Sequence, residues 1–190
     1  MTLKRKLIQL QKSKIEFINK IIIYKKMPIK IAFGGKMGTG KDCAVKYMIN
    51  KHTGVKLSFA DPIYDILHYA QQRCGLAAVK DRMFLQFVGT EWGRSINNDI
   101  WVNLLIKATP EDQNAFVSDV RFPNEFRAMK ENGWTCVKLV RNHFKAREGT
   151  GTNTHSSETS LNYIPDEEWD YIIDNNGTVA EFYESLDTIK

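Results

Sequence analysis

A glycine-rich segment near the N-terminus, "GGKMGTGKDC" (residues 34–43), most constrains how this chain can fold. Gly35, Gly40 and Lys41 match the spacing G-x-x-x-x-G-K of a loop that binds phosphate through its backbone N–H groups. The apolar run before it predicts a buried strand over residues 29–34, and the pattern after it predicts a helix over 41–50. Because a helix N-terminus attracts anions, this arrangement predicts a phosphate-binding site.

The residue after Lys41 departs from the usual pattern, in which Ser or Thr contacts Mg²⁺. Here Asp42 and Cys43 follow. Three interpretations remain open for Asp42: contact with Mg²⁺, directly or through water; a pair with an arginine such as Arg121; or stabilisation of the helix dipole, worth about 0.3–1 kcal/mol. We rank the metal role first, because Cys43 offers no hard oxygen ligand.

Beyond this segment, apolar runs alternate with helical patterns, which is typical of a parallel α/β sheet. Further strands are predicted over residues 55–60, 115–119, 134–141 and 169–174, and further helices over 61–72, 81–96, 99–108, 123–133 and 179–189. Asp61 and Pro62 are expected to cap and begin the first of these helices. The side chains expected to face inward are those of Met83, Leu85, Phe87, Val88, Trp101, Leu104 and Leu105.

Two predicted strands end in a carboxylate at the edge where an open α/β sheet binds its ligands. Asp119 ends "AFVSD" and would suit Mg²⁺ or a bound water, with Arg121 close behind it. The alternative is that Asp119 caps a helix and Arg121 is a surface charge. Asp61 follows the second strand, and an ordinary helix start explains it equally well.

Cationic side chains elsewhere are candidates for contact with phosphate. Arg94 in "GTEWGR" could hold a substrate phosphate bidentately, although a solvated arginine fits the sequence equally well. Residues 142–155 form a polar, glycine-containing segment with Arg141, Lys145 and Arg147 in or beside it. This pattern predicts a mobile cationic lid that excludes water, or else a plain surface loop.

Composition and charge narrow the functional classes. The chain of 190 residues is long enough for one domain with a sizeable core, and no apolar run is long enough to span a membrane. Its net charge of +5 is unevenly distributed, because residues 1–26 carry +7 and residues 27–190 carry −2. The folded part is therefore not expected to bind nucleic acid specifically. Three cysteines without metal-ligand spacing favour a reducing, cytoplasmic setting.

The basic segment 1–26 matches neither a signal peptide nor a transit peptide. "MPIKIAF", which begins at Met27, resembles a protein start that leads directly into a strand. We therefore expect 1–26 to be an extension that the domain over 27–190 does not need, with an upstream start codon as its origin. The alternative is an amphipathic basic helix that contacts a membrane or a partner.

Seven segments together resemble a known family: "GGKMGTGKD", "SFADPIYDIL", "LQFVGTEWGR", "DIWV", "VSDVRFPNE", "THSSETSL" and "DYIIDNNGT". In this order, over about residues 29–188, they resemble the deoxynucleoside monophosphate kinases of bacteriophages and large viruses, and more distantly animal phosphomevalonate kinase. The resemblance implies an α/β P-loop NTPase of nucleoside monophosphate kinase type: three layers, a parallel five-stranded sheet and a mobile arginine-bearing lid.

The resemblance also implies an activity and a site. The activity is transfer of phosphate from ATP, with Mg²⁺, to a deoxynucleoside monophosphate, in the host cytoplasm if the chain is viral. Residues expected near ATP are Gly35, Lys36, Met37, Gly38, Thr39, Gly40, Lys41, Asp42, Cys43 and Asn175. Residues expected near the acceptor are Asp61, Arg94, Arg121 and Glu158. Those expected to act in catalysis are Lys41, Asp119, Arg121, Arg141 and Arg147, with Asp42 and Asp119 toward the metal.

Cys43 stands where many relatives have Thr, so this chain lacks the hydroxyl that would contact Mg²⁺ or the α-phosphate at that position.

Three alternative functions remain open: a kinase of phosphomevalonate or another small molecule, a nucleotide-binding module without turnover, and a nucleic-acid binder that uses the basic N-terminus. The sequence leaves the accepted base and the oligomeric state undetermined, although homodimers are common.

Overall fold

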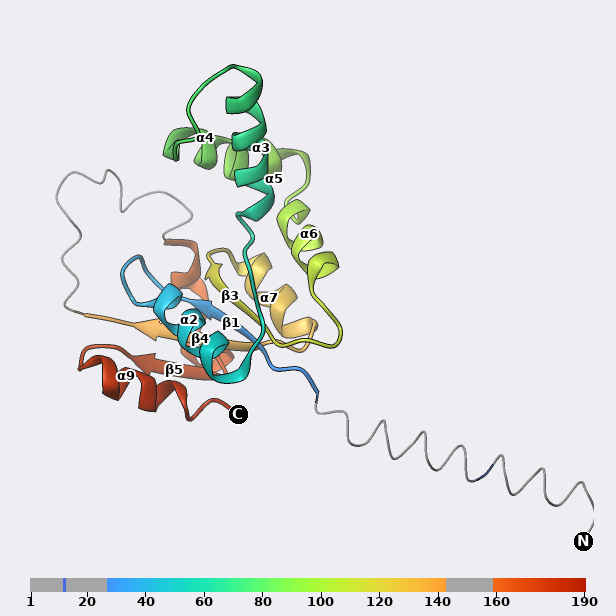
Figure 1. Cartoon of the computed structure of the whole chain (residues 1–190). Coiled ribbons are helices and arrows are strands. Elements are labelled where there is room, and N and C mark those ends of the chain that lie inside the picture. Colours follow the sequence, from blue (N-terminus) through green and yellow to red (C-terminus); the bar gives the residue numbers. More distant parts are fainter. Residues whose placement is uncertain (1–11, 13–26, 143–158) are drawn as a thin grey trace, which may run out of the picture.

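A computed structural model describes Lys12, residues 27–142 and residues 159–190 of the chain. Its centre is a five-stranded parallel sheet in the order β2-β3-β1-β4-β5 (Figure 1). The strands are β1 (Lys30–Gly34), β2 (Val55–Leu57), β3 (Ala115–Val120), β4 (Thr135–Val140) and β5 (Tyr171–Asp174). Because every strand is parallel, the carboxyl ends of all five meet at one edge, where ligands bind in open sheets of this kind.

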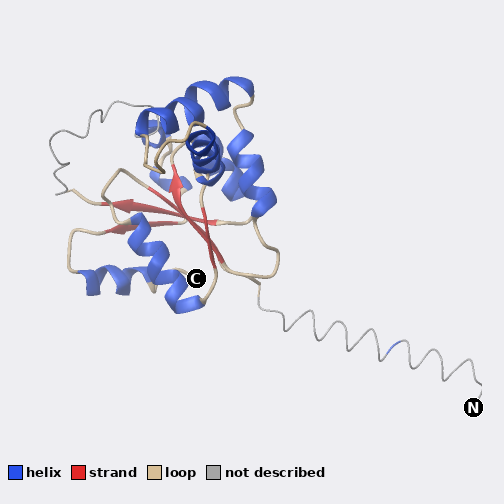
Figure 2. Cartoon of the chain, turned by 45° about the horizontal axis from the view of Figure 1, so that its top comes forward, coloured by secondary structure: helices blue, strands red, loops and turns tan. Residues whose placement is uncertain are grey.

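Helices cover both faces of the sheet, so the molecule has three layers (Figure 2). In chain order they are α2 (Lys41–His52), α3 (Asp61–Arg73), α4 (Arg82–Gln86), the π-helix η1 (Phe87–Trp92), α5 (Gly93–Ile96), α6 (Ile100–Ala108), α7 (Pro123–Glu131) and α9 (Val179–Leu186). Two short 3₁₀ helices, η2 (Ser160–Tyr163) and η3 (Asp166–Glu168), precede β5. The predicted α/β fold class is confirmed.

The two faces of β1 belong to separate hydrophobic clusters. Ile31 and Phe33 pack with the buried side chains of α2 and α9, whereas Ala32 packs with those of α6 and α7. Successive side chains of a strand point to opposite faces, so a strand that is apolar throughout is covered on both sides. This double burial fixes β1 at the centre of the sheet and with it the position of the glycine-rich loop that follows.

Two predicted strands extend at one end by two or three residues beyond those observed, whereas the other predicted strand ends lie within one residue of the observed ends. The strand expected over 55–60 ends at Leu57, because the next three residues turn to bind the Asp119 carboxylate. The strand expected over 169–174 begins at Tyr171, since η3 and the buried Trp169 occupy the chain before it. Both errors arise at strand ends, where side-chain contacts replace the ladder.

The helix expected over 81–96 consists of α4, η1 and α5, and a π-helical turn changes which side chains face inward. Val88 is buried as expected, but Met83 and Phe87 are 82% and 55% exposed. In α6, Trp101 and Leu105 are buried whereas Leu104 is 43% exposed. The inward placement of Met83, Phe87 and Leu104 was therefore wrong.

Several predictions fall outside the described residues. They concern the extension 1–26 apart from Lys12, and the expected lid over 142–155 apart from Asn142, together with Arg147 and Glu158. Among the helices that are described, none combines the length and apolarity needed to cross a membrane.

Candidate active site

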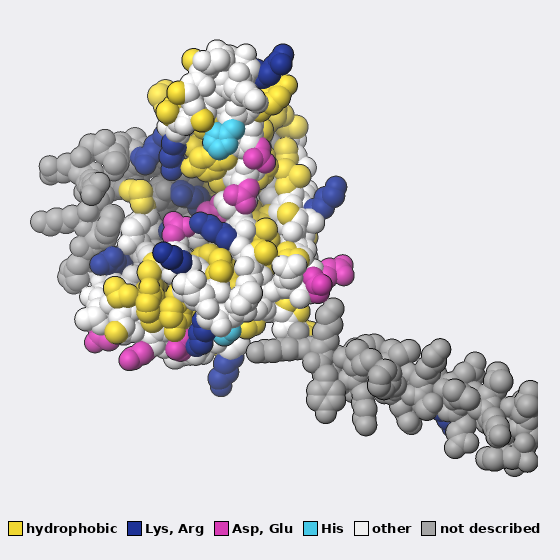
Figure 3. All heavy atoms as spheres, in the orientation of Figure 1, with side chains coloured by type: hydrophobic (Ala, Val, Ile, Leu, Met, Phe, Trp, Pro, Cys, Tyr) yellow, Lys and Arg dark blue, Asp and Glu magenta, His cyan; other side chains and the backbone are white. Residues whose placement is uncertain are grey.

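A cavity of about 650 Å³ lies between the glycine-rich loop and the helices α3 to α5. Its lining joins residues of the loop, the carboxyl ends of β2 and β3, and one face of α4, η1 and α5. Figure 3 shows charged side chains of both signs gathered at this junction between the helical part and the sheet. The sequence prediction of one site at this edge of the sheet agrees with the position of the cavity.

The loop wall of the cavity holds its shape through glycine. Gly35, Gly38 and Gly40 have φ angles of 135°, 82° and 100°, which side-chain-bearing residues rarely adopt. A Cβ atom on Gly35 would lie 2.4 Å from the carbonyl oxygen of Leu139. A Cβ atom on Gly40 would lie 2.6 Å from Nδ2 of Asn175. The loop therefore packs too tightly against β4 and the β5–α9 turn to accept a side chain at either position.

Polar contacts close the same loop. The Lys41 ammonium donates to the carbonyl oxygens of Gly35 and Lys36, each at 2.7 Å. The Thr39 hydroxyl donates to the carbonyl of Lys36 at 2.9 Å, and the Asn175 amide donates to the carbonyl of Thr39 at 2.9 Å. Asn175 thus joins the β5–α9 turn to the loop, whereas the resemblance implied only that it lies near the ATP base.

Asp42 lies at the cavity and contacts two side chains from neighbouring strands. Its Oδ1 accepts hydrogen bonds from Ser118 Oγ of β3 at 2.8 Å and from Lys56 Nζ of β2 at 2.9 Å. Burial raises the pKa of Asp42, but these hydrogen bonds and the nearby Lys41 charge outweigh it, so the pKa lies below its usual value. The lysine partner was not foreseen, since the sequence analysis considered only an arginine.

The carboxylate of Asp119 accepts hydrogen bonds from the turn that follows β2. Its Oδ2 accepts from Ser58 Oγ at 2.6 Å and from the N–H of Ala60 at 3.1 Å, and its Oδ1 accepts from the N–H of Phe59 at 3.2 Å. Burial raises the pKa of Asp119 despite these three hydrogen bonds. Asp119 lines the cavity, and it also holds β2, β3 and the start of α3 together.

Asp61 begins α3 one residue later than the expected cap, because Ala60 takes the N-cap position. Its Oδ2 accepts the N–H of Ser58 at 3.0 Å. Burial and the neighbouring Asp119 charge raise the pKa of Asp61. Among the described residues that line the cavity Asp61 is absent, which favours the local structural role that the sequence had left open.

Arg94 and Glu125 form a buried ion pair on the opposite wall. Nη2 of Arg94 lies 2.5 Å from Oε1 of Glu125, and the two side chains are 8% and 2% exposed. The guanidinium lies 3.9 Å from the ring centre of Phe122 and also donates to the carbonyl of Asn98 at 3.1 Å. Arg94 is therefore not a solvated arginine, although it does line the cavity.

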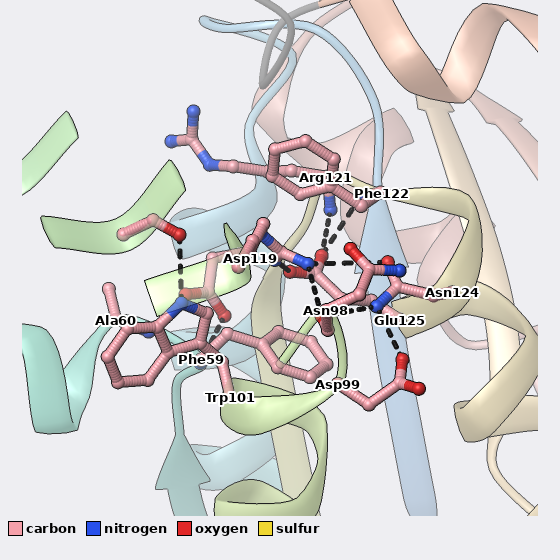
Figure 4. Close-up of polar contacts among 12 residues, drawn as sticks. Phe59, Ala60, Asn98, Asp99, Trp101, Asp119, Arg121, Phe122, Asn124 and Glu125 are labelled. Carbon is pink, nitrogen blue, oxygen red and sulfur yellow. Dashed lines mark hydrogen bonds and ion pairs between the residues drawn. The ribbon is translucent and has the colours of Figure 1, made fainter. Parts of the chain in front are cut away.

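Glu125 fixes the chain that follows β3. Its Oε2 accepts the N–H groups of Arg121 at 2.6 Å and of Phe122 at 3.0 Å, as the dashed lines in Figure 4 show. Burial raises the pKa of Glu125 to about 7, although the Arg94 charge and these two hydrogen bonds oppose the shift. The Arg121 side chain extends away from Glu125 in Figure 4, and Arg121 lines the cavity.

Several site residues escaped the sequence analysis. Lys56, Ser118 and Glu125 carry the contacts of Asp42 and Arg94, and Lys80 and Arg82 add cations to the lining of the cavity. Ser118 stands beside Asp119 in "VSDVR", and Glu125 in "FPNE" suits the first turn of a helix, so each had a local signal. Arg141 is exposed after β4 and is not among the described lining residues.

Comparisons with known proteins agree with this geometry. The family model for deoxynucleotide monophosphate kinase matches residues 77–186. "Uncharacterized protein ORF77" of Ictalurid herpesvirus 1 is 32% identical over 165 residues, which cover 83% of this chain and 68% of that protein. A protein of Acanthamoeba polyphaga mimivirus named "Putative deoxynucleotide monophosphate kinase" is 29% identical over 184 residues, covering 80% and 91%.

A solved structure supports the fold alone. Shikimate kinase from Acinetobacter baumannii superposes with a TM-score of 0.51 at 14% identity, over 88% of this chain and 98% of that one. A parallel sheet, a glycine-rich loop after its central strand and an adjoining cavity form the arrangement found in P-loop kinases. Because the family model matches more than half of the chain, this protein belongs to the deoxynucleotide monophosphate kinase family.

Proposed function

We propose that this chain transfers the γ-phosphate of ATP to a deoxynucleoside monophosphate and so produces the diphosphate. The observation that carries the proposal is the single cavity that brings the glycine-rich loop together with Arg94 and Arg121. Such a cavity suits two phosphate-bearing molecules whose phosphates must meet, since phosphoryl transfer depends chiefly on positioning and charge neutralisation. The membership of the family supports the choice of acceptor.

In the proposed reaction an oxygen of the acceptor phosphate bonds to the γ-phosphorus, and the bond from that phosphorus to the bridging oxygen breaks to release ADP. Lys41 would lie by the donor phosphates, and Arg121 would neutralise charge between donor and acceptor. The other residues proposed to act with these two are Gly35, Lys36, Met37, Gly38, Thr39, Gly40, Cys43 and Asn175 toward ATP, Arg94 and Glu158 toward the acceptor, and Asp119, Arg141 and Arg147 in catalysis.

Mg²⁺ fits the donor set of this cavity. Asp42 and Asp119 supply hard carboxylate oxygens at its lining, and Mg²⁺ commonly binds one or two carboxylates together with waters and substrate phosphates. A bound ion would reduce the negative charge of the phosphates. Asp42 would have to release the Lys56 ammonium from Oδ1 or use its other oxygen.

The kinase domain is proposed to comprise residues 27–190.

An acceptor screen tests the proposal. ADP formation from ATP and Mg²⁺ would be measured with dAMP, dGMP, dCMP, dTMP, a modified pyrimidine monophosphate and phosphomevalonate. We expect at least one deoxynucleoside monophosphate to raise ADP formation well above the acceptor-free rate, and phosphomevalonate to leave it unchanged. Activity with phosphomevalonate alone would overturn the proposal in favour of a different small-molecule kinase. Nucleotide binding without turnover on any acceptor would favour the non-catalytic module.

A further inference from the structure

Three cavity-lining side chains follow one another at intervals of four residues along the helical wall. Gln86 ends α4, Thr90 lies in η1 and Arg94 lies in α5. Residues four apart share a face of a helix, so these three form a row along the cavity. Eight helical residues advance at most about 12 Å, which suits the length of a nucleoside monophosphate lying along the row.

Two members of this row have no polar contact within the described part of the chain. There, neither the Gln86 carboxamide nor the Thr90 hydroxyl forms a hydrogen bond, although both residues are half-buried. Arg94, by contrast, is held by Glu125 and Asn98. Polar groups that face a cavity and lack a protein partner pair with water or with a ligand that replaces it. Gln86 and Thr90 therefore present unused donors and acceptors to the cavity.

Packing does not account for this placement. Met83 and Phe87 belong to the same segment, and they face solvent with 82% and 55% of their surface exposed. The usual amphipathic arrangement would bury the apolar side chains and expose the polar ones. Here Val88 is buried and Phe84 and Leu85 pack against the core, whereas Met83 and Phe87 face solvent and Gln86 and Thr90 line the cavity. The segment thus buries only part of its apolar surface while it turns two polar side chains toward the cavity.

The wall that carries the two polar groups is fixed from behind. Between them lies Gly89, whose carbonyl accepts a hydrogen bond of 2.8 Å from the buried Trp101 indole. A Cβ atom on Gly89 would approach Ile63 Cδ1 to 3.0 Å, so the backbone packs closely on α3. The segment is π-helical, and π-helical turns occur frequently at functional sites. Rigid support of this kind is what a recognition surface requires.

We propose that Gln86 and Thr90 recognise the base of the acceptor nucleotide, an inference that rests on the proposed function. With the acceptor phosphate toward Arg94, the base extends along the row to Thr90 and Gln86. A carboxamide and a hydroxyl each both donate and accept hydrogen bonds, as the edges of nucleobases do. Gln86 and Thr90 therefore determine which deoxynucleoside monophosphate is preferred, and Arg94 does not.

The test compares kcat/KM for dAMP, dGMP, dCMP and dTMP among the wild type, Gln86→Leu, Gln86→Glu and the near-isosteric Thr90→Val. Gln86→Leu and Thr90→Val each lower kcat/KM for the preferred acceptor by about three- to tenfold, the value of one neutral hydrogen bond. They lower it less for the poorest acceptor, and KM for ATP stays unchanged. Gln86→Glu, which only accepts when ionised, shifts the ratios toward bases with an exocyclic amino group and away from dTMP.

Met83→Ala is the matched control, because Met83 lies on the same segment and faces solvent. It leaves all four ratios at their wild-type values. Normal melting of Gln86→Leu and Thr90→Val with unchanged ratios would overturn the inference and leave the proposed function intact. If Gln86→Leu fails to fold, Thr90→Val decides. If the wild type phosphorylates none of the four monophosphates, the proposed function fails. Binding then tests the base subsite separately: if the relative Kd values of the four monophosphates are the same in the variants as in the wild type, the inference is overturned.

Discussion

The two walls of the cavity differ in what gives them their shape. The loop wall, residues 34–43, depends on the backbone: three glycines with positive φ and contacts to main-chain carbonyls. The helical wall, α4 to α5, depends on side chains from distant segments, of which the buried pair of Arg94 and Glu125 is the centre. The first arrangement is mostly local in sequence, with the Asn175 amide on the Thr39 carbonyl as its contact from a distant segment, and the second joins residues 31 positions apart.

This difference predicts different responses to mutation. Lys41 and Asp42 of the loop wall line the cavity, so removal of either side chain should reduce activity more than stability. A side chain of the helical wall is also part of the packing, so its removal should reduce both. The family model matches residues 77–186 and therefore includes the helical wall but not the loop. The matched region thus includes the wall of the site whose side chains also take part in the packing.

The largest effect is expected from breaking the buried pair. Arg94→Ala leaves the Glu125 carboxylate buried without its partner, which typically costs about 3–5 kcal/mol. This corresponds to a Tm lower by about 6–20 °C for a chain of this size. Loss of the Arg94 charge also raises the pKa of Glu125 further. Calorimetry or circular dichroism measures the Tm.

Lys130→Ala is the control for that experiment, because Lys130 and Asp170 form an ion pair of the same length, 2.5 Å, that is about one third exposed. Exposed pairs contribute about 0–1 kcal/mol, so its Tm should change little. Equal losses of stability in the two variants would contradict the claim that burial makes the Arg94 pair structural.

The next effect concerns the loop wall. Lys41→Met should lower kcat by about 10²- to 10³-fold, the usual consequence of losing one charge-stabilising group. The melting temperature should change little, since the Lys41 ammonium donates to carbonyls of its own loop, at Gly35 and Lys36. Near-normal turnover in a folded Lys41→Met variant would show that this loop does not bind the donor phosphates.

Arg121→Ala tests whether the two walls serve different substrates. The Arg121 side chain extends from the end of β3 at the cavity lining, so its loss should raise KM for the monophosphate by about tenfold and KM for ATP much less. The main-chain bond from Arg121 to Glu125 is preserved in this variant, which keeps the fold intact. Equal increases in both KM values would contradict the assignment of Arg121 to the monophosphate.

A pH experiment examines the helical wall without removing the pair. The pKa of Glu125 rises from 4.5 to about 7, so the folded state keeps this proton to higher pH than the unfolded chain does. The contribution of this proton to the free energy of unfolding is fully present below about pH 4.5, and it is lost as the pH rises through about 7. Urea unfolding at pH 4.5 and 7.5 should show a larger decline in the wild type than in Glu125→Gln. Identical declines would contradict the assignment.

The smallest effect is expected at Asp42. Because this side chain is exposed, Asp42→Asn should change stability by no more than about 1 kcal/mol. If Asp42 serves Mg²⁺, the variant needs more Mg²⁺ for half-maximal activity, whereas Lys56→Met, which removes the competing ammonium from Oδ1, needs less. A change in Tm alone would favour the dipole interpretation, and a change in monophosphate KM alone would favour a role at the acceptor.

The same contrast explains what the sequence could predict. Gly35, Gly40 and Lys41 are close in the chain, and the loop needs only their spacing, so its position and conformation were predictable. Asp119 and Arg121 were placed correctly at the sheet edge, because they follow the apolar part of a strand and the carboxyl ends of parallel strands meet at that edge. The partners of Asp42 and Arg94 come from other strands and helices, so local patterns at Ser118 and Glu125 mark those residues but do not show which side chains they contact. The prediction that Met83 and Phe87 face inward was wrong, because a π-helical turn changes which side chains of this segment face inward.

Direct transfer of labelled phosphate tests the central claim that both walls serve one reaction. The chain would be incubated with ATP labelled at the γ-phosphate, Mg²⁺ and each deoxynucleoside monophosphate, and the products separated. We predict that label appears at the β-position of a deoxynucleoside diphosphate, with ADP formed in equal amount, and that Lys41→Met and Arg121→Ala both reduce it. Label found only in inorganic phosphate, or transferred to none of the monophosphates by a folded chain, would contradict the account.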